Sequence, residues 1–118
     1  MNETTEQLRQ RTKALAVRVV RLFRSLPESR DAQVIGTQLL RCGTSVGANY
    51  RAVCRARSKA DFISKIGIVL EEADETVFWL ELLIETGIVP ENKLKELLQE
   101  ARELIAIFTA TQRTSRSH

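Results

Sequence analysis

Side chains that could support catalysis are scarce in this sequence. The one histidine is His118, the last residue, and the two cysteines, Cys42 and Cys54, do not form a C-x-x-C motif. There is no glycine-rich phosphate-binding loop, and no Glu-x-x-His pair of the kind that holds iron in helical bundles. A general base, an activated nucleophile or a metal site would require such residues. The sequence therefore predicts a protein that is not an enzyme, has no catalytic residues and needs no cofactor.

A run of carboxylates offers the main candidate for metal chemistry. It consists of Glu71, Glu72, Asp74 and Glu75. In a helix these residues spread around the axis, so only pairs such as Glu71 and Glu75 share a face. Pairs of this kind are typical of a solvated or subunit-facing acidic surface, since burial would need basic partners. We predict no metal site.

Basic side chains gather in the first half of the chain. Residues 1–57 contain eleven Lys or Arg and four Asp or Glu, whereas residues 58–118 contain seven and eleven. Guanidinium groups suit phosphates, and binding of this kind is salt-dependent and largely independent of base sequence. The predicted nucleic-acid-binding residues form one stripe on each of two helices: Arg11, Arg18 and Arg21, then Arg41, Arg51 and Arg55. A solvated or inter-subunit basic face is an open alternative, and Tyr50 is the one aromatic side chain nearby.

The segment over residues 76–83 is apolar around more than one face of a helix, with Phe78 and Trp79 next to each other. A helix that is apolar over so wide an arc needs more than one partner surface. We therefore predict an oligomer interface that comprises Glu71, Glu75, Phe78 and Trp79. The alternative is a wide intramolecular core with Trp79 partly exposed.

These residues must be positioned by helices. With 43% hydrophobic and 28% charged residues, only 2 Pro and 5 Gly, the chain has the composition of a helical protein with one core. Apolar side chains recur three and four positions apart over four segments, and short loops make successive helices antiparallel neighbours. The sequence predicts an all-α, antiparallel up-down-up-down four-helix bundle that forms a single domain over residues 1–118. The predicted helices cover residues 4–25, 31–57, 59–86 and 90–112.

Local signals predict where these helices begin and end. Pro27 follows the first helix, and Ser58 with Asp61 forms a variant capping box before the third. Gly87 is placed to stop the third helix and Pro90 to open the fourth. The polar tail from residue 109 onward is expected to fray.

Three glycines, Gly36, Gly43 and Gly47, interrupt the second predicted helix, each at a cost of about 1 kcal/mol relative to Ala. Tight packing through small residues would compensate, and so would a bend or a close contact with a ligand. Cys42 and Cys54 lie about 18 Å apart on this helix at 1.5 Å per residue, so they cannot form a disulfide. With no signal peptide and no long apolar segment, we expect a cytoplasmic protein with two reduced cysteines.

Several segments resemble a bacterial family of four-helix bundle proteins. They are QLLR at residues 38–41, SVGANY at 45–50, RSKADF at 57–62 and EEADE at 71–75. The family includes the 23S rRNA intervening sequence proteins and the accessory variability proteins of diversity-generating retroelements. The resemblance covers nearly the whole chain. Within it Arg41, Ser45, Asn49 and Ser58 match the signature of the second helix.

The resemblance implies a cytoplasmic bundle that assembles into a homopentamer. It also implies a basic surface that contacts RNA or DNA and, in retroelement members, a reverse transcriptase. We therefore predict a non-enzymatic homo-oligomer that binds nucleic acid, or a nucleic-acid-processing protein, through the basic faces of the first two helices. The alternative is an assembly or protein-interaction module without nucleic-acid binding, in which the basic half pairs with the acidic surface of the next subunit.

Overall fold

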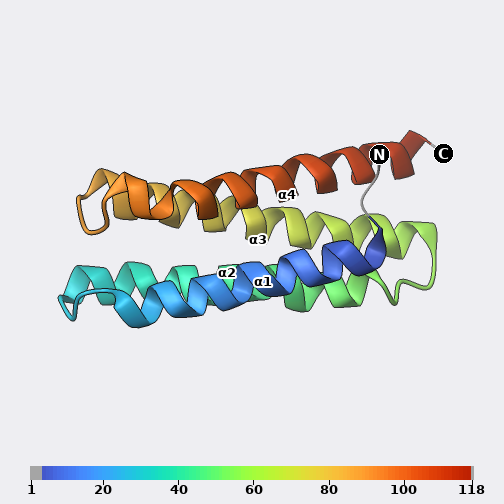
Figure 1. Ribbon diagram of the computed structural model, residues 1–118. Coiled ribbons are helices and arrows are strands. Elements are labelled where there is room, and N and C mark those ends of the chain that lie inside the picture. Colours follow the sequence, from blue (N-terminus) through green and yellow to red (C-terminus); the bar gives the residue numbers. More distant parts are fainter. Residues whose placement is uncertain (1–3, 118) are drawn as a thin grey trace.

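Four long helices make up almost all of the computed structural model, which describes residues 4–117. They are α1 (Thr5–Ser25), α2 (Arg30–Val53), α3 (Lys59–Glu85) and α4 (Glu91–Ser117). Successive helices run in opposite directions and form an elongated bundle measuring 47 × 24 × 21 Å (Figure 1). This confirms the predicted all-α antiparallel four-helix bundle, and the part of the chain described contains no strand.

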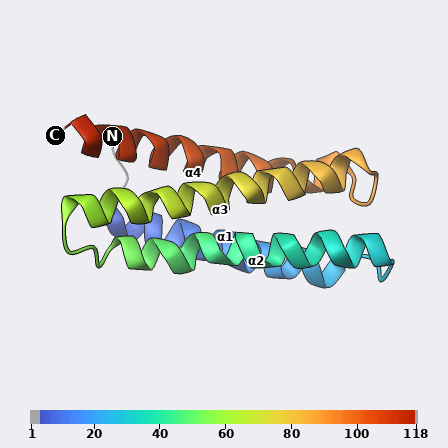
Figure 2. The same ribbon diagram turned by 180° about the vertical axis from the view of Figure 1, so that it is seen from behind.

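The four helices do not pack equally closely. Each helix packs extensively against the next along the chain, whereas α1 and α4 make far fewer contacts with each other. Figure 2 shows α2 and α3 on one broad face, and Figure 1 shows α1 and α4 on the opposite face. The α1–α4 side is therefore the open side of the bundle.

Side chains cap the helices largely where the sequence indicates. The hydroxyl of Ser58 accepts a hydrogen bond from the amide of Asp61 at 3.0 Å, and this confirms the N-cap of α3. The carboxylate of Asp61 accepts from the amide of Arg57 instead of closing the box on Ser58. Gly87 has a φ of 76° just past the end of α3, which confirms its role as the stop signal.

Two helix ends differ from the prediction. Helix α2 ends at Val53 instead of residue 57, because the turn over residues 54–58 is needed to place Ser58 as the cap of α3. Helix α4 does not fray after residue 109 but continues to Ser117. Hydroxyl groups in this segment donate to carbonyls one turn back, as Thr111 does to Ile107 at 2.9 Å, so polar residues are accommodated within the helix.

The core runs along the whole bundle axis and draws on all four helices. Its largest fully buried side chains include Phe108, Leu15, Leu39 and Leu80. The ring of Tyr50 packs against Phe108 with centroids 5.3 Å apart. Within the described chain, no buried side-chain nitrogen or oxygen lacks a hydrogen-bond partner.

The glycines of α2 allow α1 to approach closely. A Cβ atom at Gly43 would lie 2.8 Å from Cγ2 of Val19, and one at Gly47 would lie 3.1 Å from the backbone oxygen of Thr12. Both distances are shorter than an ordinary van der Waals contact. Tight packing of α1 on α2, rather than a bend or a ligand, therefore accounts for these two glycines.

Candidate nucleic-acid and subunit interfaces

Arg41 on α2 lies opposite the acidic run of α3. Its guanidinium donates to both carboxylate oxygens of Glu72 at 3.4 Å and also to Glu75. The hydrogen bond from Arg41, with a second from the indole of Trp79, holds the pKa of Glu75 below its ordinary value. A predicted nucleic-acid-binding residue is thus paired, within one chain, with a predicted oligomer-interface residue.

Arg11 bridges the open side of the bundle from α1 to α4. Its Nη2 and Nε atoms donate to the two carboxylate oxygens of Glu100 at 2.6 and 3.0 Å, and Nη2 also reaches Glu103 at 3.1 Å. The side chains of Arg11 and Glu100 are only 23% and 22% exposed. A two-point contact of this kind, partly shielded from solvent, orders both side chains and offsets the charge of Arg11.

Arg18 and Arg21 continue the stripe of Arg11 along α1 but lack its carboxylate partners. Both line a cleft on the open side of the bundle, together with Lys93 of α4. Across residues 4–117, no ion pair involves any of these three side chains. No carboxylate among the described residues therefore neutralises them by direct contact.

Arg51 and Arg55 lie on the last turn of α2 and just beyond it, and both are exposed. Arg57 and Lys59, also exposed, follow in the turn and at the start of α3. As far as the structure describes the chain, none of the four forms a salt bridge. Arg57 and Lys59 were not among the predicted binding residues, because that prediction rests on helix faces and both residues follow the end of α2. The close spacing of basic residues through the turn was the signal for them.

The six predicted arginines consequently occupy different settings. Arg11 and Arg41 are tied to carboxylates of α4 and α3 respectively. The other four, Arg18, Arg21, Arg51 and Arg55, are unpaired within the described residues, the first two beside α4 and the last two at the α2–α3 turn. The structure therefore separates two unpaired groups of basic side chains, and we call the second, comprising Arg51, Arg55, Arg57 and Lys59, the turn cluster.

The outward face of α3 combines apolar and acidic side chains. Phe78 is 53% exposed and Ile68 is 45% exposed, with Glu71 exposed between them. Trp79 is half-buried against the core, and its ring meets that of Phe78 edge-on with centroids 4.9 Å apart. Ile68 shares this face at helical spacing and was not among the predicted interface residues, although a period of three and four from Phe78 leads to it.

The carboxylates and thiols of the described residues are not arranged as a metal site. Over residues 4–117 no group of three His, Cys, Asp or Glu is placed to hold a metal ion. Both cysteines are free; Cys42 is fully buried, and burial raises the pKa of its thiol. The one histidine of the sequence, His118, lies outside the described residues. None of the helices described is long and apolar enough to cross a membrane.

Comparison with known proteins agrees with this architecture. Residues 5–110 match the family described as 23S rRNA-intervening sequence protein. A crystal structure of a protein of unknown function from the S23 ribosomal protein family of Bacteroides thetaiotaomicron is 35% identical in sequence. It superimposes with a TM-score of 0.85 over 92% of this chain and 97% of that one. No curated protein matches the chain.

Proposed function

Since this chain belongs to the 23S rRNA-intervening sequence protein family, we propose that it is a non-enzymatic, homo-oligomeric bundle that binds nucleic acid or a nucleic-acid-processing protein such as a reverse transcriptase. The basic faces of α1 and α2 would make the contact. A cytoplasmic location and a five-subunit ring, both implied by the family resemblance, are part of the proposal.

The observation that carries this proposal is the set of arginines without carboxylate partners. Arg51 and Arg55 are exposed and unpaired among the described residues, and the turn cluster adds two further basic side chains within a few positions. An unpaired guanidinium can bind a phosphate without first giving up an ion pair, whereas Arg11 and Arg41 would have to release theirs. We therefore centre the contact on the turn cluster.

The mode of binding follows from where the aromatic side chains lie. Tyr50, the one aromatic residue near the basic stripe of α2, is only 6% exposed because its ring packs against Phe108. Stacking on an aromatic platform is how proteins hold unpaired bases, and Tyr50 is not available for it. Binding should therefore depend on phosphate contacts and be nearly independent of base sequence.

The test is fluorescence anisotropy with labelled mixed-sequence RNA and with labelled duplex DNA. Each affinity is measured at several salt concentrations between about 50 and 200 mM. We expect affinity to fall steeply with salt, and the Arg51→Glu plus Arg55→Glu double variant to bind at least about tenfold more weakly with a shallower salt slope. The matched control is Lys95→Glu plus Arg113→Glu, which makes the same change in charge at exposed positions of α4. Equal loss in both variants would show that only net charge matters, and would contradict a defined site.

A second function is favoured by the outward face of α3. Phe78 and Ile68 are exposed apolar side chains beside acidic residues, as expected of a surface that meets another subunit. In this alternative the protein is an assembly or protein-interaction module, and the turn cluster pairs with the acidic surface of a neighbouring copy. The Arg51→Glu plus Arg55→Glu variant would then lower the mass measured by multi-angle light scattering, and nucleic acid would not bind to the wild-type assembly.

A further inference from the structure

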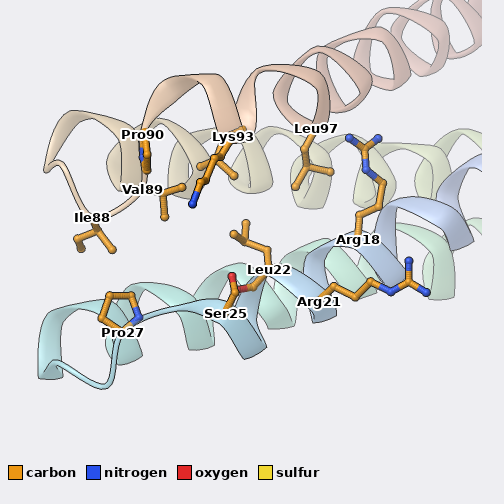
Figure 3. A pocket seen from close by; sticks show the side chains of 11 residues that line it. Arg18, Arg21, Leu22, Ser25, Pro27, Ile88, Val89, Pro90, Lys93 and Leu97 are labelled. Atoms are coloured by element: carbon orange, nitrogen blue, oxygen red, sulfur yellow. The ribbon is translucent and has the colours of Figure 1, made fainter.

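The open side of the bundle contains a cleft of about 580 Å³ between α1 and α4. It lies where the last turns of α1 face the α3–α4 turn and the first turns of α4 (Figure 3). Ligand sites in proteins commonly have volumes of roughly 300 to 1,000 Å³ and often lie between the helices of a bundle. The cleft therefore has the size of a small-molecule site.

Cationic side chains approach this cleft from both helices. Arg18 and Arg21 come from α1 and Lys93 from α4, and no carboxylate is among the eleven residues that line it. In Figure 3 Lys93 extends from α4 toward α1, while Arg18 extends from α1 toward α4. A cleft lined by cations and by no carboxylate has a positive potential, so an anion is favoured there.

The remainder of the lining is aliphatic. Leu94 and Leu97 of α4 line the cleft and are only 2% and 4% exposed. In Figure 3 the side chain of Leu22, from α1, lies across from that of Leu97. No aromatic side chain lines the cleft, so a nucleobase or another flat ring would find no stacking partner. The apolar surface suits a flexible hydrocarbon chain better than a ring.

We propose that this cleft binds a small amphiphile with an oxyanion head, either a carboxylate or a phosphate, and an aliphatic body. The head binds Arg18, whose guanidinium can hold two oxygens at once, and Lys93 adds to the positive potential of the cleft. The aliphatic chain covers Leu22, Leu94 and Leu97. This site is separate from the turn cluster and does not depend on nucleic-acid binding.

The test uses isothermal titration calorimetry of the full chain with dodecanoate and with dodecyl phosphate, both below the concentration at which they form micelles. Hexanoate and inorganic phosphate serve as probes that lack the long chain. We expect saturable binding at one site per chain, at least about tenfold tighter for the long-chain probes because more apolar surface is buried. Binding without a plateau, or equal affinity for inorganic phosphate and dodecyl phosphate, would overturn the proposal.

Two matched variants separate the cleft from general charge. Arg18→Gln plus Lys93→Gln removes one cation from each side of the cleft and should weaken binding at least about tenfold. Lys13→Gln plus Lys95→Gln changes the same net charge on the same two helices at positions outside the lining, and should bind within about twofold of wild type. Equal loss in both variants, with unchanged thermal unfolding by circular dichroism, would contradict the assignment.

Two further experiments identify the source of the anion and test whether the cleft is independent of the turn cluster. Retention on phosphatidylglycerol vesicles that Arg18→Gln plus Lys93→Gln abolishes would assign the cleft to a lipid headgroup, whereas binding of the soluble probes alone would assign it to a free amphiphile. The Arg51→Glu plus Arg55→Glu variant, altered only in the turn cluster, should keep wild-type affinity for dodecanoate. Loss of affinity in that variant would overturn the separation of the two sites.

Discussion

Arg41 of α2 and Glu75 of α3 are joined by a hydrogen-bonded ion pair at the surface of the bundle. Glu72 lies 3.4 Å from the same guanidinium, so two carboxylates of the acidic run share one arginine. The pair links the two helices whose contact holds the first half of the bundle to the second. Part of the acidic surface of α3 is therefore neutralised within the chain before any second subunit is considered.

This pair predicts a specific dependence of stability on pH. Because the pKa of Glu75 is lowered in the folded state, chiefly by Arg41, its contribution to stability is present above the carboxyl pKa of the unfolded chain. It is lost as the pH falls through the lowered folded-state pKa. The difference in urea midpoint between wild type and Glu75→Gln should therefore be largest near neutral pH and should shrink below about pH 4.

The control for this titration is Glu71→Gln. Glu71 is exposed on the same helix and forms no ion pair with any residue the structure describes. Its substitution should leave the urea midpoint close to that of wild type at every pH. If the urea midpoints of wild type and Glu75→Gln differed by the same amount at every pH, the charge of Glu75 would contribute nothing to folding through Arg41.

Helix packing predicts opposite effects for two glycines. At Gly47, a Cβ atom would lie 3.1 Å from the backbone oxygen of Thr12, and backbone cannot move aside as a side chain can. Gly47→Ala should therefore destabilise the fold by about 1 to 3 kcal/mol through overpacking, despite the better helix propensity of Ala. Chemical denaturation followed by circular dichroism measures the difference.

Gly67 on α3 provides the matched comparison. The nearest atom to a Cβ there is Nε2 of Gln112 at 3.3 Å, the far end of a flexible side chain. Gly67→Ala should be neutral or stabilise the protein by up to about 1 kcal/mol, as expected for removing glycine from a helix interior. If both alanine variants were equally stable, close packing of α1 on α2 would not explain Gly47.

The sequence predicted the helices because their apolar side chains recur with the period of an α-helix, and Gly87 and Ser58 carry local stop and start signals. It did not predict the end of α2 or the extent of α4, where local hydrogen bonds decide between helix and turn. The sequence also did not predict the ion-pair partners of Arg11 and Arg41. Arg11 meets Glu100 across 89 positions and Arg41 meets Glu75 across 34, so both pairs depend on how the helices are registered against one another. The cleft between α1 and α4 arises from unequal packing of helices and has no local signature.

The two cysteines are predicted to differ in reactivity. Cys42 is fully buried and burial raises the pKa of its thiol, whereas Cys54 is half-buried at the end of α2. Since the thiolate is the reactive form, Ellman's reagent should label Cys54 in the native protein and Cys42 only when the protein unfolds. In Cys54→Ser the remaining label should appear at the rate of global unfolding. Rapid labelling of that variant would mean that the α2–α3 interface opens locally.

The exposed ring of Phe78 predicts how the bundle assembles. Phe78 is 53% exposed, rests edge-on against Trp79 and shares the outward face of α3 with Ile68, which is 45% exposed. If this face meets another subunit, Phe78→Ser should lower the mass measured by multi-angle light scattering at micromolar concentration. It should change the stability of the single chain by only about 0.5 kcal/mol, since an exposed ring contributes little to folding.

Val17→Ser is the matched control for Phe78, because Val17 is 40% exposed but lies on α1, which among the described residues does not pack against α3. It should leave the mass unchanged. A loss of mass in Phe78→Ser alone would place the subunit contact on α3. The acidic side chains around Phe78 would then select a basic partner surface. Equal masses for both variants and wild type would instead show that this face of α3 does not form the subunit contact. The exposed ring would then have to bind a different protein partner.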